Sequence, residues 1–555
     1  MDVSAHCLRY GAYLSLFAFC AGAPGGFAQT EPTSITPVFR ASTHLVVLDV
    51  IVTDKSGKAV PGLHAEDFSV KENGKIQTIR FLNQPKNEPE VAVTALPPNT
   101  YSNAAEYRLA GSTPTVIVLD AANTPFTDQV YARRQMLQYL KTQYQTGQRT
   151  AIFTLTDKLS LLQDFTGDPQ LLIDSLKKFE PGEPSFVKDM SSGDPPSPIG
   201  VNTPQQYHYI LAAFERFQRS QVEYTVARRA EVTLQALRRI NRILGGLPGR
   251  KNLVWVTGGF PFALDPDLSV SPSTDVAETF HQPGRFPGRT VRSGVGMDQK
   301  FLFVGQIREI SAQLATSQIA IYPVDAEGLV VTRSMNNIER QETMREIASQ
   351  TGGKALISQN DIERGFALAQ LDRAATYTLG YYPDNKRFDG KYRSIQVKTD
   401  RAGMQTTYRR GYFAVDPMSF KKEEIDRSVG DAWDDGVPDT MVTFQAKIAA
   451  VDNKKARVEF LVDANTLSFG DDPSGKKLDT SFYVASCSNN GAILNLKGAN
   501  LQRTYSAENV QQYLRDGMRL RLDVDAPTGT SLLRIAVRDN RTGYIGTLMA
   551  PIPKP

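Results

Sequence analysis

The fold of this chain is decided by the stretch Thr115-Val116-Ile117-Val118-Leu119-Asp120-Ala121-Ala122-Asn123-Thr124, in which an apolar run ends in an aspartate and a polar turn. A second apolar run, residues 252–259, follows far downstream, after a segment whose leucines have helical spacing. Strands that are apolar along their whole length and alternate with helices predict a mostly parallel sheet with helices on both faces. Polar groups at the carboxyl ends of such strands line the crevice in which open α/β sheets bind ligands.

Length and composition indicate several soluble domains. The chain has 555 residues, too many for one hydrophobic core, and its hydrophobic content of 41% and charged content of 22% are typical of globular protein. The net charge of +4 is spread over this length, and basic and aromatic residues do not cluster as an RNA-binding sheet requires. We therefore expect no nucleic-acid partner.

The N-terminus has the pattern of a signal peptide. Arg9 precedes an apolar run at 13–23, and Gly26 and Ala28 are the small residues of a cleavage site after Ala28. A membrane anchor is the alternative, but a span needs about 20 apolar residues and this run is shorter. No later segment is apolar enough to span a membrane. We expect residues 1–28 to be removed and the mature chain to be exported to the periplasm, the cell envelope or the medium.

The cysteines and histidines argue against an enzyme. Cys7 and Cys20 fall in the expected leader, which leaves Cys487 without a second cysteine for an internal disulfide, and we expect it to be an unreactive thiol. The bulky residues 17–19 argue against lipid attachment at Cys20. The sequence has no histidine or cysteine spacing suited to zinc and no GxSxG nucleophile elbow. Outside the expected leader, the histidines are scattered at His44, His64, His208 and His281.

The pattern along the chain predicts three kinds of domain. Residues 29–98 form an N-terminal β module in which Asn73-Gly74 predicts a hairpin turn. Residues 112–375 form the α/β domain. Strands within 376–414 are expected to pair with the N-terminal β module, because neither group alone has enough strands for a stable sheet. Residues 440–555 alternate short strands with Gly, Asp and Asn turns, which predicts a C-terminal β-sandwich.

Between these domains, composition predicts linkers and boundaries. Residues 84–112 are rich in Pro, Asn, Ser and Thr and are expected to be a linker, and the charged stretch 421–439 marks a boundary. The α/β domain is expected to contain a long helix at 204–244 and to end with a helix at 361–373.

Several segments together resemble the von Willebrand factor A-related family known from acidobacterial secreted proteins. The resemblance is carried by the segments 48–54, 63–73, 119–124, 248–255, 322–325 and 379–383, and it covers about residues 43–414. It implies a von Willebrand factor A-like domain, in which a Rossmann-like, mostly parallel sheet has helices on both faces, here with β-sandwich-like flanking domains.

The resemblance also implies a metal-ion-dependent adhesion site (MIDAS), built from Asp-x-Ser-x-Ser, a Thr on a second loop and an Asp after a later strand. Asp120 matches the first aspartate and Thr124 the second hydroxyl, whereas Ala122 replaces the first Ser. Thr257-Gly258-Gly259 stands where the family has Thr-Asp-Gly, so Gly258 replaces the second carboxylate. The ion would be Mg²⁺, or Mn²⁺ or Ca²⁺. In cation-binding relatives it accepts an acidic residue of the partner. With one carboxylate left, we expect weak or no binding at this degenerate site.

Each of these residues also has a plainer interpretation. Asp120 is suited to cap the following helix or to serve as a structural polar group, and Asn123, Thr257 and Gly258 would then form a partner-binding loop without metal. The long helix also carries a basic face, which predicts a solvated surface or, alternatively, a surface for an acidic partner. Its basic residues are Arg228, Arg229, Arg238, Arg239 and Arg242.

The sequence therefore predicts a secreted or periplasmic, non-enzymatic module for protein binding or cell adhesion. Its ligand, a protein or a cell-surface molecule, would meet the strand-end loops of the α/β domain. The alternative is a structural scaffold of the cell envelope without metal-dependent ligand binding.

Overall fold

The computed structural model describes residues 45–84, 95–107, 114–144, 149–187, 208–262, 303–328, 335–357, 375–401, 403–415, 437–452 and 454–553. The expected leader at 1–28 and the expected helix at 361–373 lie outside these residues. None of the helices in the described part of the chain has an apolar stretch of the length that crosses a bilayer.

A five-stranded sheet forms the centre of the α/β region. Its strands are β10 (Ile319–Asp325), β9 (Lys251–Thr257), β6 (Thr115–Asp120), β7 (Thr150–Leu155) and β8 (Leu159–Thr166), in that spatial order. The first four run parallel, and β8 returns antiparallel to β7. Since all residues of β9 and β10 are buried, these strands need apolar side chains on both faces.

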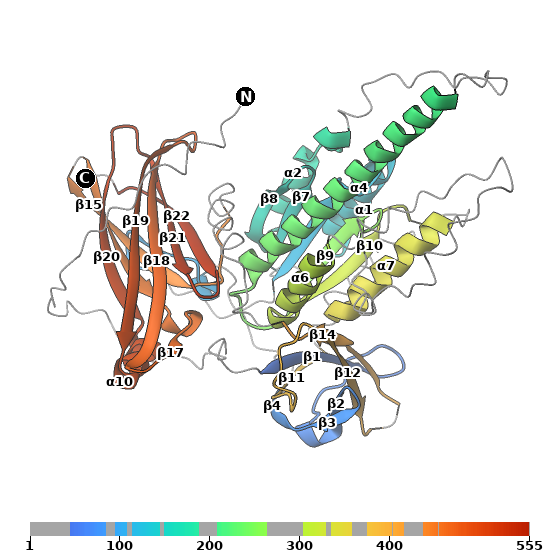
Figure 1. The fold of residues 1–555 in the computed structure, drawn as a ribbon, viewed down its shortest axis with the longest axis horizontal. Helices are drawn as coiled ribbons and strands as arrows, with labels where there is room; N and C mark the ends of the chain where they lie inside the picture. Colours follow the sequence, from blue (N-terminus) through green and yellow to red (C-terminus); the bar gives the residue numbers. More distant parts are fainter. Residues whose placement is uncertain are drawn as a thin grey trace. The chain divides into compact units, whose positions relative to one another are not determined.

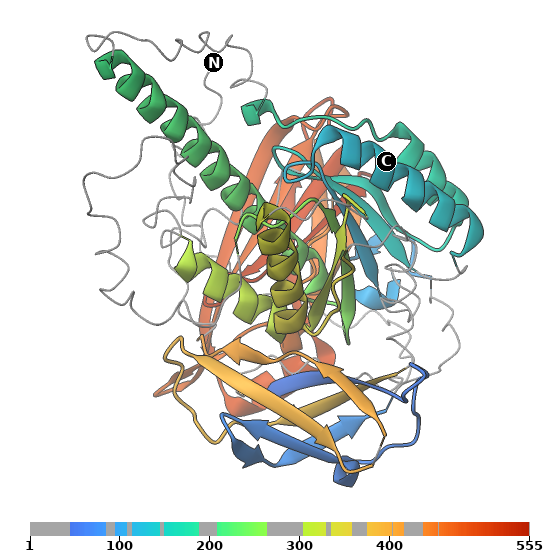
Figure 2. The same cartoon turned by 90° about the vertical axis from the view of Figure 1, so that its right-hand side faces the viewer.

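Helices cover both faces of this sheet (Figures 1 and 2). One face is covered by α1 (Phe126–Thr142) and α2 (Pro169–Lys178). The other face is covered by α4 (His208–Leu244), α6 (Val304–Thr316) and α7 (Met335–Thr351). Alternate residues of β6 point to the two faces, Ile117 and Leu119 toward α1 and α2, and Val116 and Val118 toward the other three helices. The expected mixed α/β architecture around a sheet with parallel strands is confirmed.

Strands from before and after the α/β region share two further sheets. One has the order β13-β1-β11-β4 and the other β14-β12-β2-β3. The strands are β1 (Val46–Thr53), β2 (Phe68–Glu72), β3 (Lys75–Gln77), β4 (Ile79–Asn83), β11 (Thr376–Tyr381), β12 (Tyr392–Thr399), β13 (Gln405–Tyr408) and β14 (Gly411–Phe413). Asn73 and Gly74, both with positive φ, make the tight turn between β2 and β3. One apolar core lies between the two sheets.

The C-terminal strands form two sheets around a separate apolar core. One sheet has the order β20-β16-β15-β5, and the other has the order β17-β18-β21-β22 with β19 paired to β18. The bounds are β5 (Thr100–Ser102), β15 (Phe444–Asp452), β16 (Lys455–Val462), β17 (Gly470–Asp472), β18 (Gly475–Cys487), β19 (Ile493–Tyr505), β20 (Met518–Asp525), β21 (Leu532–Asp539) and β22 (Ile545–Pro551), with helix α10 (Ala507–Asp516) before β20.

Strand β5 lies in the segment that the sequence predicts to be a linker. It pairs with β15, and the fully buried Asn103 that follows it fixes the edge. The Asn103 side-chain amide donates to the carbonyls of Asp439 and Val442 over 2.8 and 2.9 Å, and its Oδ1 accepts the amide of Phe444 over 2.8 Å. A three-residue strand held by an asparagine has no apolar periodicity, so its composition resembles that of a loop.

The end of α4 packs against residues 437–442, which precede the C-terminal strands. Arg239 is buried and forms an ion pair and hydrogen bond with the fully buried Asp439, and Arg242 lies 3.7 Å from the same carboxylate. A Cβ at Gly246 would lie 1.5 Å from the Thr440 carbonyl oxygen, so only glycine allows this approach. The basic face of α4 is therefore not a solvated surface at this end, because its acidic partner belongs to the same chain.

Candidate functional site

The loop of residues 120–124, between β6 and α1, is folded around the Asp120 carboxylate. The Asn123 backbone amide donates to Asp120 Oδ1 over 3.0 Å, and its side-chain amide donates to Oδ1 and Oδ2 over 3.1 and 2.9 Å. Helix α1 has Pro125 at its N-cap without a side-chain cap hydrogen bond, so the interpretation of Asp120 as the helix cap is wrong. Asp120, which is 2% exposed, holds the loop together.

Strand β9 supplies another donor to this carboxylate. The fully buried Trp255 donates from Nε1 to Asp120 Oδ2 over 2.9 Å. Burial raises the pKa of the Asp120 carboxyl, while hydrogen bonds from Trp255, Asn123 and Thr257 act in the opposite direction. The sequence reasoning missed this contact. The signal was available, because a tryptophan within a buried apolar strand needs an acceptor for its N–H.

The turn after β9 closes the site from the other side. The amide of Gly258 donates to Thr124 Oγ1 over 2.8 Å. The Thr257 hydroxyl donates to the Gly259 carbonyl over 2.8 Å. A Cβ at Gly258 would lie 2.8 Å from the Asn123 carbonyl oxygen, so the aspartate that cation-binding von Willebrand factor A domains carry at this position does not fit. The structure thus brings to one edge of the sheet Asp120, Asn123, Thr124, Thr257 and Gly258.

Helix α4 passes beside this loop and adds residues that the sequence reasoning did not assign to the site. The Asn123 side-chain amide donates to Thr233 Oγ1 over 3.0 Å. Arg229 lies one turn earlier on the same face. Its guanidinium interacts electrostatically with Asp120 and Glu183, and burial lowers its pKa. The buried Nε of Arg229 has no hydrogen-bond partner among the described residues.

A divalent cation does not fit this arrangement. Mg²⁺ takes six oxygen ligands in near-octahedral geometry. Both Asp120 oxygens already accept N–H groups, the Thr124 hydroxyl accepts an amide, and the side chain of Ala122 has no ligand atom. Gly258 leaves no room for the missing carboxylate. Within the described ranges, no group of three or more His, Cys, Asp or Glu side chains is placed to hold a metal ion.

A second group of charges lies where β10 ends and α7 begins. The Glu327 amide donates to Asp325 Oδ1 over 3.1 Å, and the Glu327 carboxylate forms an ion pair with Arg340. The side chain of Arg340 crosses Gly259, where a Cβ would lie 2.9 Å from its Cδ. Burial and the negative charge of Glu327 both raise the pKa of Asp128, in the first turn of α1. The two groups of charges therefore border the same turn.

Large apolar side chains are exposed on the helices α1, α4 and α7. Phe126 and Val130, one turn apart at the start of α1, are 51% and 45% exposed. Ile338, two residues before Arg340 on α7, is 47% exposed, and Tyr224 on α4 is 58% exposed. Exposed apolar groups gathered around a polar site mark binding surfaces more often than single ones do.

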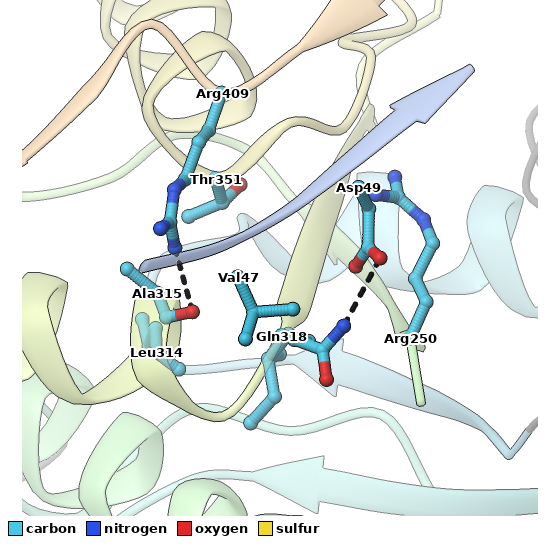
Figure 3. A pocket seen from close by; sticks show the side chains of 9 residues that line it. Val47, Asp49, Arg250, Leu314, Ala315, Gln318, Thr351 and Arg409 are labelled. Atoms are coloured by element: carbon cyan, nitrogen blue, oxygen red, sulfur yellow. Dashed lines mark hydrogen bonds between the residues drawn. The ribbon is translucent and has the colours of Figure 1, made fainter. Parts of the chain in front are cut away.

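A small cavity lies elsewhere, where β1 meets the α/β region (Figure 3). Gln318 donates to Asp49 Oδ1 over 3.0 Å, and Arg409 donates to the Ala315 carbonyl over 2.6 Å. Arg250 lines the same cavity and donates to the Gly352 carbonyl over 2.7 Å. The volume is about 10 Å³, which is enough for about one water molecule. The cavity is too small for an organic ligand, and its polar side chains connect β1 to the α/β region.

Neither a family model nor a curated protein matches this chain. Similar solved structures include an aerotolerance-related membrane protein from Bacteroides fragilis, at 12% identity and a TM-score of 0.23, with 47% of this chain and 98% of that one covered. The PilB minor pilin from Streptococcus sanguinis has 11% identity and a TM-score of 0.25, with 48% and 62% covered. Proximal thread matrix protein 1 from the mussel byssus, with a zinc-occupied MIDAS motif, has 12% identity and a TM-score of 0.21, with 50% and 48% covered.

The chain therefore spans about half the length of the mussel protein and more than half of the pilin. TM-scores this low do not assign a function or a family. The strand order and the packing of helices against both faces of the sheet define the fold.

Proposed function

We propose that this chain is an exported, non-enzymatic protein-binding module of the von Willebrand factor A type, in which the strand-end loops form the ligand surface. The order β10-β9-β6-β7-β8, with one antiparallel edge strand, supports the fold assignment. So does the position of the Asp120 loop, directly after a central strand. The partner is a protein or a cell-surface ligand, and the contact loop contains the half-buried Asn123 together with Thr257 and Gly258, which are buried beside it.

The exposed apolar residues beside the loop are the observation that carries this proposal. Phe126 is the first residue of α1, directly after the loop, and half of its surface is in water. Fully burying such a side chain is worth about 1.5–3 kcal/mol. Aromatic side chains are enriched in the cores of protein interfaces. Phe126 and Val130 thus have the chemistry of contact residues.

We also propose that binding does not depend on a metal ion. In a cation-dependent site, the metal organises the loop and supplies its positive charge. Here Trp255 and Asn123 organise the Asp120 carboxylate through hydrogen bonds, and Arg229 contributes positive charge beside it. Asp120 and Thr124 then act as structural residues of the loop and not as metal ligands.

An envelope scaffold without such binding is the second candidate. It is favoured by the close packing of the end of α4 against residues 437–442, where a buried ion pair and a glycine contact hold the two segments together. On either proposal we divide the chain into an N-terminal β module at 29–98 completed by 376–414, an α/β domain at 112–375 and a β-sandwich at 440–555. The two sheets that combine β1–β4 with β11–β14 support this division, and β5 adds a strand from before the α/β domain to the β-sandwich.

The test compares two serine variants as affinity baits for envelope proteins of the native organism. The Phe126→Ser variant changes the proposed surface. The Leu171→Ser variant is a matched control, because Leu171 is 49% exposed at the start of α2, near the opposite end of the sheet. We expect the control and the wild type to capture the same proteins, in buffers with EDTA or with Mg²⁺, and Phe126→Ser to lose them. Equal capture by all three baits would favour the scaffold.

A further inference from the structure

We infer that the partner presents a positively charged segment with an apolar anchor to the strand-end loops. This inference rests on the proposed function and names the chemistry of the partner. Its charge is the reverse of the one that the resemblance implies, because a cation-dependent site accepts an acidic residue.

The partner's charge is reversed because the Asp120 loop does not fit a cation. In a metal-loaded site, a divalent ion outweighs the carboxylates that hold it and leaves a positive position for the ligand. Here the donors around Asp120 are neutral N–H groups from Trp255 and Asn123. They satisfy the carboxylate without adding net charge. The sign of the surface is then set by the ionised side chains around the loop.

Those side chains are mostly acidic in the described part of the chain. The cations are Arg229, which interacts with Asp120 and Glu183, Arg340, which is paired with Glu327, and the exposed Lys158 in the turn after β7. The carboxylates around the same edge are Asp128, Asp157, Glu183 and Glu327, with Asp120 and Asp325 buried behind them. Among the described residues of this edge, carboxylates thus outnumber cations, whereas the whole chain carries a net charge of +4.

Two of these carboxylates are placed to meet a basic side chain. Asp128 lies in the first turn of α1, between the exposed Phe126 and Val130 in sequence. Glu183 is exposed and has Arg229 as its electrostatic neighbour. A lysine or arginine beside an apolar anchor residue would meet both the apolar side chains of α1 and the negative edge. Such complementarity gives association that weakens as salt is added.

The probe is a pair of fluorescein-labelled synthetic peptides of equal length with the same Leu-Phe anchor. One has lysines and the other glutamates at the flanking positions. Fluorescence anisotropy with the full chain, in EDTA and at about 0.05 and 0.3 M salt, measures binding of each. We expect the lysine peptide to bind, with an affinity that falls as salt rises, and the glutamate peptide to bind at least about tenfold more weakly.

Two double variants test where the charge acts. Asp128→Asn with Glu183→Gln removes two negative charges from the edge, one of them the electrostatic neighbour of Arg229. Glu66→Gln with Glu508→Gln makes the same change in net charge at exposed positions outside the α/β sheet. We expect the first pair to weaken binding of the lysine peptide about five- to tenfold and the second to leave it unchanged.

The outcomes separate this inference from the proposed function. Equal effects of the two double variants would mean that net charge alone attracts the peptide, and this would overturn the inference. Tighter binding of the glutamate peptide, above all with added Mn²⁺, would overturn it too. So would failure of both peptides while Phe126 remains necessary for capture of envelope proteins, and in that case the proposed function would stand.

Discussion

Replacing Asp120 by alanine distinguishes a structural carboxylate from a metal ligand. If the only role of Asp120 were to bind a metal ion, the variant would be at least as stable as the wild type in EDTA, because the substitution would remove only a partly desolvated charge. In this structure the change leaves the Trp255 indole N–H and two Asn123 N–H groups without their acceptor. Trp255 is fully buried, so water cannot replace the carboxylate there.

The size of the effect follows from the burial of these donors. A buried donor left without an acceptor costs about 1–3 kcal/mol, which applies in full to Trp255. Asn123 is half-buried, so its amides recover part of their hydrogen bonding from water and add about 1 kcal/mol. Removing a carboxyl whose pKa is raised by burial returns part of this loss. We expect Asp120→Ala to lower the free energy of unfolding by about 2 kcal/mol.

Urea unfolding measures this change if one region is observed alone. The chain has two tryptophans, Trp255 and Trp433. In a Trp433→Phe background, the fluorescence of Trp255 reports on the α/β region, which matters because a chain of several domains does not unfold in one step. Unfolding is followed in EDTA and in Mg²⁺. A double-mutant cycle with Trp255→Phe, followed by circular dichroism, isolates the indole–carboxylate hydrogen bond.

One result would refute this reasoning. If Asp120→Ala has wild-type stability in EDTA and loses a stabilisation that Mg²⁺ gives the wild type, then Asp120 is a metal ligand. Ligand binding to the native state raises stability by mass action, so such a shift would reveal an occupied site. A cycle with no coupling between Asp120 and Trp255 would also contradict the described geometry.

Further changes probe other parts of the structure. Gly258→Asp introduces the aspartate of cation-binding von Willebrand factor A domains. It should destabilise the α/β region by about 1–3 kcal/mol in urea unfolding, because its Cβ meets the Asn123 carbonyl, and should give no Mn²⁺ binding by electron paramagnetic resonance. Asp439→Asn leaves Arg239 with an uncompensated buried charge and should cost about 3–5 kcal/mol in the same assay. Burial raises the pKa of Tyr392 to about 12, and its folded pKa therefore lies above the unfolded value near 10. Its contribution to stability is present below pH 10 and is lost as pH rises toward 12. The melting temperature should therefore fall between about pH 10 and 12, and it should fall less steeply in Tyr392→Phe.

The sequence was sufficient for the strands that hold the site. Because β6 and β9 are buried on both faces, their apolar runs are continuous and easily recognised. The same runs place Asp120 and Thr257 at the ends of neighbouring strands. Their position at one edge of the sheet could therefore be predicted before any coordinates.

What the sequence could not provide were the contacts between distant segments. The spacing of Arg239 along α4 gives a face of the helix, but nothing local indicates that Asp439 covers it. The role of Asp120 could not be predicted from the sequence for a related reason. Whether an aspartate after a strand binds a metal or accepts hydrogen bonds depends on the neighbouring strand, and here Trp255 decides it.

The two sheets that combine strands from before and after the α/β region also set an order of events during synthesis. Leu63 donates its amide to the hydroxyl of Tyr377, 314 residues later, and β1 obtains its partners β11 and β13 only when those strands emerge. At synthesis rates of about 5–20 residues per second, that delay is roughly 15–60 seconds. During this interval the α/β region can complete its own core, while the edges of β1 stay unpaired and open to wrong pairing. A chain truncated before Thr376 would keep those edges open permanently, and its aggregation would reflect the missing last strands of a sheet begun at Val46.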